Sequence, residues 1–404
     1  MPGSSGAVVR LAVLSDSHAS SEDPTKTTSA STWVRKDETE GRENPLAGLA
    51  EFIDKTDELR ADVLLCPGDL CDQADWDALP YAWEQLQDLA AHLGAEETVA
   101  TVGNHDIDSH DKRGAATVEA GLRGLVPHFP TVSTTPVTPF WDERICVVTG
   151  TDWRVVSLNS SLMRKLDTAN NERDHGTVED PTLYRLQALI EDDTHEINVL
   201  LCHHHPLPST HLDPRDQSQM QNGDRLVRLL DDLPHHWLVV HGHKHEPHLG
   251  YLGGTGDAPI RLAAGSVGAN LWGTLGAHVR NQIHLVEIPV DPAARANLTL
   301  AGRVRSWTWQ PRTGWRQAIP GEGLPARAGF GHSTSGVTVA RDVVQWAQSQ
   351  GLNVISRDAL IHKEPKLPYL LPEDLSRFIS EVEGPLRGRV SLDSNYEIER
   401  IVLP

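Results

Sequence analysis

Short apolar runs alternate with longer amphipathic segments over about the first 290 residues of the chain. Since side chains repeat at every second residue in a strand and about every 3.6 residues in a helix, the two kinds of segment predict strands and helices respectively. The predicted strands are Val8–Leu14, Asp62–Cys66, Thr98–Val102, Ile145–Val148, Arg154–Leu158, Ile197–Cys202, Trp237–Val240, Ile260–Ala264 and Ile283–Ile288. The predicted helices are Leu46–Arg60, Leu79–His92, Thr182–Glu191 and Arg225–Leu230. This alternation is typical of an α/β fold.

Polar segments interrupt the alternation directly after strand ends, at Ala19–Asn44, Met163–Asp180 and Pro208–Asp224. Strand ends are where α/β folds place their functional loops. Loops of this length are usually lids, recognition loops or disordered segments. We therefore expect them to bear on substrate choice.

The pattern changes after about residue 290. Asn297–Trp309 alternates like a strand, Pro311–Pro325 has the Gly and Pro content of a loop, and Val337–Gln350 and Pro372–Val382 have helical spacing. The sequence thus predicts a main α/β domain over residues 1–290 and a C-terminal extension of unknown role over residues 291–404.

Composition and charge narrow the class of protein. Of 404 residues, 39% are hydrophobic, which is enough for a large core, and the formal net charge of −20 argues against general attraction to polyanions. Nucleic acid is therefore a less favoured substrate, although bound cations would reverse the field locally. No apolar run is long enough for a membrane helix or a leader peptide, and the cysteines form no CxxC pair. These features predict a cytoplasmic protein without membrane contact and indicate no particular oligomeric state.

Five polar segments that follow apolar runs contain the residues with metal-binding chemistry. They are Asp16–His18, Gly68–Asp72, Gly103–Asp106, His203–Pro206 and Gly242–His245. Because the carboxyl ends of parallel strands gather at one edge of a sheet, we expect these segments to converge.

The residue types in these segments suit a pair of cations. Asp16 and His18 are alternate residues, so both can face one ion, and a carboxylate at Asp69 can bridge two ions. Carboxylates, imidazoles and one amide oxygen, with little thiolate, favour two divalent ions of Mn, Fe or Zn over a structural zinc cluster. His105, next to Asn104, is then free to act as an acid.

In order, the five segments read D-x-H, G-D-x-x-D, G-N-H-D, H-x-P and G-H-x-H. This set resembles the signature of the calcineurin-like metallophosphoesterase superfamily over about residues 8–290. The chain looks most like the prokaryotic class III phosphodiesterases of that superfamily, which act on cyclic nucleotides and glycerophosphodiesters.

The resemblance implies a four-layer α/β/β/α sandwich and a role for each matching residue. Asp16, His18 and His245 would hold one metal and Asp69 would bridge to the second, which is held by Asn104, His204 and His243. Counting back from Pro206 selects His204, and the neighbouring His203 stays an alternative. His105 would be the catalytic acid, with Asp106 orienting its ring.

The predicted function is hydrolysis of a small phosphodiester by attack of a metal-bridging hydroxide, as the resemblance implies. The alternatives are a DNA nuclease or a phosphomonoesterase of the same superfamily, or a regulatory module without turnover. Acidity and the lack of a basic stripe count against the nuclease, and the intact ligand set counts against the regulatory module.

Overall fold

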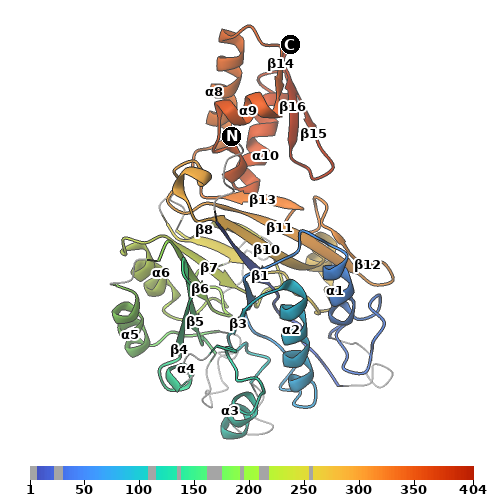
Figure 1. Cartoon of the computed structure of the whole chain (residues 1–404), viewed down its shortest axis with the longest axis vertical. Helices are drawn as coiled ribbons and strands as arrows, with labels where there is room; N and C mark the ends of the chain where they lie inside the picture. The colour runs from blue at the N-terminus through green and yellow to red at the C-terminus, as the bar shows by residue number, and fades with distance from the viewer. Residues whose placement is uncertain are drawn as a thin grey trace.

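A computed structural model describes residues 7–21, 31–107, 115–133, 138–161, 175–191, 195–208, 218–253 and 258–404. Two large sheets pack face to face, and helices cover their outer faces (Figure 1). This arrangement confirms the predicted α/β/β/α class. Within the described residues, none of the helices has the length and apolar content needed to cross a bilayer.

The first sheet has the strand order β12-β11-β10-β1-β2-β3, with β13 paired to β11. Its strands are β1 (Val8–Val13), β2 (Val63–Cys66), β3 (Glu97–Ala100), β10 (Asn281–Pro289), β11 (Gly302–Gln310), β12 (Gly314–Gln317) and β13 (Arg327–Phe330). Strands β1, β2 and β3 are parallel, and β10 runs antiparallel to β1. Helices α1 (Pro45–Asp54) and α2 (Leu79–Leu93) cover this sheet, and Asn44 caps α1 by accepting from the backbone N–H of Leu46.

The second sheet has the order β4-β5-β6-β7-β9-β8. Its strands are β4 (Ile145–Thr149), β5 (Trp153–Leu158), β6 (Ile197–Leu201), β7 (Trp237–His241), β8 (His248–Tyr251) and β9 (Ile260–Ala263). Strands β5, β6, β7 and β9 are parallel. Helices α5 (Asp180–Ile190) and α6 (Gly223–Asp231) cover its outer face. The shorter helices α3 (Ala115–Arg123), α4 (Thr138–Glu143) and α7 (Gly273–His278), which the periodicity did not predict, lie in connections.

Strand β6 separates two hydrophobic cores by its alternation. Val199 and Leu201 pack in the core between the two sheets, whereas Leu200 and Cys202 pack in the core beneath α5 and α6. Because His203 follows Leu201 by two residues, it continues toward the space between the sheets.

The C-terminal extension begins later than predicted. Strands β11, β12 and β13 belong to the first sheet, so the boundary predicted near residue 290 falls inside that sheet. The stretch after β10, which contains the short 3₁₀ helix η3 (Pro292–Arg295), connects antiparallel neighbours and does not separate two domains.

A separate unit with its own core follows β13. It contains α8 (Gly336–Ser349), β14 (Val354–Ser356), α9 (Arg357–Lys363), the 3₁₀ helix η4 (Leu367–Tyr369), α10 (Pro372–Glu383), β15 (Arg389–Leu392) and β16 (Ile398–Val402). Arg303 on β11 and Arg327 on β13 form ion pairs of 3.6 and 3.3 Å with Glu397, which connect the unit to the first sheet.

Candidate metal centre

The polar segments after β1, β2, β6 and β7 are bonded to one another where the two sheets meet. The backbone N–H of Asp16 donates to the carbonyl of Gly68 at 3.0 Å, and that of Gly242 donates to the carbonyl of His203 at 3.1 Å. The N–H of His243 donates to a carboxylate oxygen of Asp16 at 3.1 Å, which connects the two sheets directly. The predicted convergence is therefore present in the fold.

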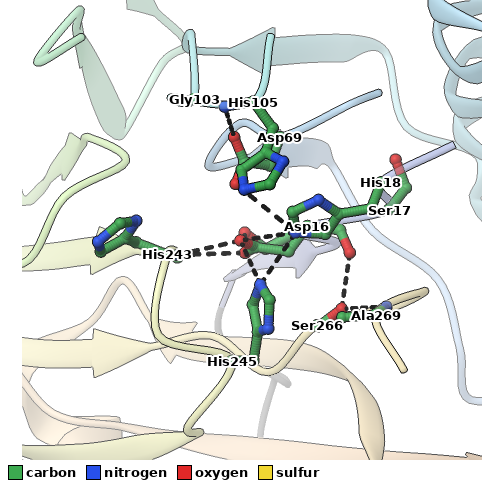
Figure 2. Close-up of polar contacts among 12 residues, drawn as sticks. Asp16, Ser17, His18, Asp69, Gly103, His105, His243, His245, Ser266 and Ala269 are labelled. Carbon is green, nitrogen blue, oxygen red and sulfur yellow. Dashed lines mark hydrogen bonds and ion pairs between the residues drawn. The ribbon is translucent and has the colours of Figure 1, made fainter. Parts of the chain in front are cut away.

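A first cluster surrounds the carboxylate of Asp16 (Figure 2). His18 Nε2 and His245 Nε2 are 2.9 Å apart, and Asp16 Oδ1 is 3.8 Å from the first and 3.3 Å from the second. Asp69 Oδ2 is 3.6 Å from His18 Nε2. Two imidazole nitrogens this close, flanked by two buried carboxylates, form a set of donors that one divalent cation could join.

A second cluster is built around the side-chain oxygen of Asn104. Both His203 Nε2 and His243 Nδ1 are 2.9 Å from Asn104 Oδ1. His203 Nδ1 donates to the carbonyl of Pro67 at 2.9 Å, which leaves the Nε2 lone pair for the cluster. This arrangement is the one found for histidines that bind metals.

One carboxylate belongs to both clusters. Asp69 Oδ2 is 3.6 Å from His18 Nε2 in the first cluster and 3.3 Å from His203 Nε2 in the second. Burial opposes ionisation of Asp69, yet the imidazoles of His203 and His105 hold the pKa of this carboxyl below its usual range. The charge that stabilises Asp69 in this way is the kind of charge that a pair of cations would supply.

The backbone at the site adopts an uncommon conformation. Asp16, His18, Asp69, His243 and His245 all have positive φ, between 47° and 77°. A non-glycine residue in the left-handed region costs about 1–3 kcal/mol, and such residues concentrate at functional sites. These turns direct donors from separate strands toward one point at the expense of local stability.

The two candidate histidines of the fourth segment make different contacts in the structure. Counting back from Pro206 selected His204, but it is His203 that contacts Asn104 and Asp69. His204 Nδ1 is instead 2.9 Å from Ser160 Oγ. The reason is the alternation of β6, which places His203 on the side of Val199 and Leu201.

Asp106 was expected to orient the ring of His105, but its carboxylate instead bonds to backbone groups. Its carboxylate accepts hydrogen bonds from the backbone N–H groups of Asp69 (2.9 Å), Cys71 (3.1 Å) and Gly103 (2.9 Å). Burial and the charge of Asp69 raise the pKa of Asp106 to about 6. Asp106 thus connects the second and third polar segments.

The imidazole of His105 is held by Asp72 instead. His105 Nδ1 is 2.8 Å from Asp72 Oδ1, and Asp72 Oδ2 accepts from Ser31 Oγ at 2.6 Å. The His105 ring packs edge-on against His18 with centroids 4.5 Å apart, and its side chain is 34% exposed. Asp72 is the last residue of the G-D-x-x-D segment, so its place in that motif was the signal available in the sequence.

Ser266, which follows β9, supports the first cluster. Its Oγ donates to the carbonyl of Asp16 at 2.7 Å and accepts from the N–H of Ala269 at 2.7 Å (Figure 2). It therefore stabilises the strained turn at Asp16 from the neighbouring strand end.

Gly242 lies against the first cluster, and its lack of a side chain can be tested. A Cβ atom there would be 2.3 Å from Asp16 Oδ2 and 2.3 Å from Ser15 Oγ, which is far inside contact distance. We expect Gly242→Ala to displace the Asp16 carboxylate and to weaken metal binding at the first cluster by roughly 10–100-fold, as outer contacts of metal sites do. Isothermal titration of the metal-free protein with Mn²⁺ measures this, and unchanged affinity would show that Asp16 does not depend on this contact.

The donor chemistry of both clusters fits the pair of divalent cations that the motifs predict. Together they offer two carboxylates, one amide oxygen and four imidazoles, at Asp16, Asp69, Asn104, His18, His203, His243 and His245. All seven residues come from strand ends of an α/β/β/α fold. Fold and site together define the class of dinuclear metal-dependent hydrolases.

Comparison with known proteins identifies the family. The family described as calcineurin-like phosphoesterase matches residues 9–247, which is more than half of the chain. The chain belongs to this family and is a metal-dependent phosphoric ester hydrolase. A search of curated proteins gives no match.

Comparison with solved structures gives matches at low sequence identity. A dimetal phosphatase from Danio rerio is 10% identical with a TM-score of 0.46, and the match covers 75% of this chain and 99% of that one. The purple acid phosphatase PPD1 from yellow lupin (Lupinus luteus) seeds is 11% identical with a TM-score of 0.50, covering 81% of this chain and 54% of that one. The likeness to the lupin phosphatase shows the fold alone.

Proposed function

We propose that this chain hydrolyses small phosphodiesters with two divalent cations. The first cation is held by Asp16, His18, Asp69 and His245, and the second by Asp69, Asn104, His203 and His243. The single observation that carries the proposal is that Asp69 Oδ2 lies between His18 Nε2 and His203 Nε2, at 3.6 and 3.3 Å. A carboxylate oxygen shared by two donor clusters is what a bridged pair of ions requires.

When bound, such a pair stabilises charge on the phosphate oxygens and lowers the pKa of water toward about 7. The protein contributes pre-organised donors. Asp16 and Asp69 are buried and held by backbone N–H groups, so they need little rearrangement as charge develops on the phosphate.

His105 is the proposed acid for the leaving group. Since Asp72 accepts a hydrogen bond from His105 Nδ1–H, the imidazolium form of His105 has Nε2–H as its remaining donor. The ring is partly exposed beside His18, where it can reach an oxygen that leaves from a phosphate at the clusters. Transfer of that proton would stabilise an alkoxide leaving group.

The choice of a diester rests on the motifs. Gly103–Asp106, His204–Pro206 and Gly242–His245 are the segments that most resemble the class III phosphodiesterases, and a cyclic nucleotide or a glycerophosphodiester is the kind of substrate they imply. The net charge of −20 favours a small substrate over a polyanion. All four cysteines are free and buried, which supports the predicted cytoplasmic location.

The deciding experiment compares bis-p-nitrophenyl phosphate with p-nitrophenyl phosphate in the presence of Mn²⁺ or Zn²⁺. We expect higher kcat/KM on the diester. Faster turnover of the monoester would indicate a phosphomonoesterase, and turnover of neither by the metal-loaded protein would indicate a regulatory module. A panel of cyclic nucleotides, glycerophosphodiesters and single-stranded DNA then identifies the substrate class.

Asp72 and Asp106 are expected to fail in different ways when substituted. Asp72→Asn should retain both metals but lose roughly 10–100-fold in kcat, the usual cost of removing an orienting partner, with a larger loss on alkyl than on p-nitrophenyl leaving groups.

Asp106→Ala should lower the free energy of unfolding, because each backbone N–H left without a partner costs about 1–3 kcal/mol. Thermal unfolding, metal content and kcat for both variants check the assignment. Loss of leaving-group dependence in Asp106→Ala alone would return the orienting role to Asp106.

A further inference from the structure

His204 lies beside the second cluster, and one of its ring nitrogens is held by a serine. Its side chain is buried, and Nδ1 is 2.9 Å from Ser160 Oγ. The backbone N–H of His204 donates to the same oxygen at 3.3 Å. Among the residues that the structure describes, buried Nε2 has no hydrogen-bond partner. Native proteins seldom leave a buried polar atom in this state, so we looked for a ligand that Nε2 could bind.

The ring of His204 lies next to the two histidine rings of the second cluster. One ring nitrogen each from His203, His204 and His243 lies within 4.8 Å of the others. The His204 centroid is 4.9 Å from that of His203 and 4.8 Å from that of His243. Three imidazoles therefore converge where the family pattern supplies a single histidine from each of the fourth and fifth segments.

The orientation of His204 is fixed by its surroundings. Gly176 packs on the ring so closely that a Cβ atom there would be 2.4 Å from the His204 Cγ and Nδ1 atoms. Ser160, which follows β5, holds the ring through Nδ1. A ring fixed between two segments in this way is typical of a built site.

The hydrogen bonds agree with a metal-binding tautomer. A hydroxyl oxygen has two lone pairs, so Ser160 Oγ can accept both the backbone N–H and Nδ1–H of His204. Nε2 then carries a lone pair, as in histidines that bind a metal through one nitrogen and donate through the other.

We propose that His204 is a third imidazole ligand of the second cation, together with His203 and His243, and that it makes this site prefer Zn²⁺ over Mn²⁺. The proposal rests on the dinuclear site of the proposed function. Imidazole is a borderline ligand that suits Zn²⁺, whereas Mn²⁺ suits carboxylate, carbonyl and water oxygens. The first site, with two carboxylates and two imidazoles, lacks this bias, so the two sites would differ in metal preference.

Equilibrium metal binding tests this without any need for turnover. The metal-free full chain is titrated with Zn²⁺ and Mn²⁺ in competition with a chromophoric chelator, and the Co²⁺ form is examined by visible absorption. The variants are His204→Ala, Ser160→Ala and, as a matched histidine control, His236→Ala, which removes a histidine just before the amino end of β7.

We expect His204→Ala to bind Zn²⁺ at the second site about 100-fold more weakly or worse, since even outer contacts of metal ligands are worth roughly 10–100-fold. Its affinity for Mn²⁺ should change less, and its Co²⁺ spectrum should change. Ser160→Ala should show a smaller change in the same direction and serves if His204→Ala does not fold. The control should match the wild type.

Unchanged affinities for Zn²⁺ and Mn²⁺ in His204→Ala would overturn the proposal. A raised KM with unchanged metal binding in His204→Ala would also overturn it, because it would indicate that Nε2 binds the substrate and not a metal. A wild-type chain that binds two ions but hydrolyses no ester would contradict the proposed function alone, since the affinity shift is still measurable.

Discussion

Asp69→Asn is expected to lose both metal ions and nearly all activity. The Asp69 carboxylate lies within 3.6 Å of a histidine nitrogen in each cluster, and a neutral amide is a poor bridge between two cations. Loss of a single electrostatic stabiliser typically costs about 10²–10³ in kcat. Since Asp69→Asn lowers the affinity for both ions at once, we expect a loss of at least about 10³-fold in kcat/KM, with fewer than two ions retained after dialysis.

The control for this substitution lies at the opposite end of β2. Asp62 directly precedes β2, is exposed, and accepts from the backbone N–H of Arg10 at 2.7 Å. Asp62→Asn removes the same charge without touching either cluster and should keep both metals and activity. Retention of two ions by Asp69→Asn, measured by inductively coupled plasma mass spectrometry, would show that Asp69 does not bridge them.

The strands that position the site could be predicted from the sequence because each has a simple apolar pattern. Every predicted strand of the first 290 or so residues occurs, with ends shifted by at most two residues. The strands that periodicity missed are short, from three to five residues in β8 (His248–Tyr251), β12 (Gly314–Gln317), β13, β14, β15 and β16. Such segments are held by pairing to longer neighbours, which a local pattern does not report.

The position of the domain boundary depended on contacts that are distant in the sequence. Residues Arg303–Trp309 of β11 pair with β10, for example Trp309 with Asn281, and the connection between the two strands begins with Val290, Asp291 and Pro292. A connection that contains Asp and Pro fits a turn between antiparallel neighbours as well as a linker between domains. Only the pairing distinguishes them.

The choice between His203 and His204 illustrates how a motif and a strand period can disagree. Counting back from Pro206 follows the spacing in relatives, whereas the alternation along β6 follows the packing of this chain. Side chains on one face of a strand recur at every second residue, so the positions of Val199 and Leu201 indicate that His203 continues toward the core between the sheets, where it contacts Asn104. In the same way, Asp106 was assigned to His105 by adjacency, although Asp72 makes the contact.

The strained turns at the site couple metal binding to the stability of the folded chain. Several of the proposed ligands occupy the left-handed region, and the buried carboxylates of Asp16 and Asp69 lie close together at the same point. Both features cost stability in the folded chain, and cations that bind only the folded state offset that cost. The ligands and the turns that present them are thus one structural unit.

His105→Ala is expected to keep both metals and to lose roughly 10²–10⁴-fold in kcat on diesters with alkyl leaving groups, which is the usual contribution of a general acid. His105 lies near His18 and Asp72, and its side chain is 34% exposed. Among the described hydrogen bonds, its ring contacts neither Asn104 Oδ1 nor Asp16. A p-nitrophenolate leaves without protonation, so the loss should be much smaller on bis-p-nitrophenyl phosphate. Steady-state kinetics on both substrates, with metal content measured in parallel, give the comparison.

The chain contains a matched pair against which to judge this variant. His92 Nδ1 is 2.8 Å from Asp54 Oδ1, the same separation as between His105 and Asp72, and its side chain is 38% exposed. His92 lies on α2, outside both clusters, so His92→Ala removes an equivalent histidine–aspartate contact and should leave kcat unchanged on either substrate. Equal losses on alkyl and p-nitrophenyl leaving groups in His105→Ala, or loss of a metal ion, would mean that His105 positions the site and does not protonate the leaving oxygen.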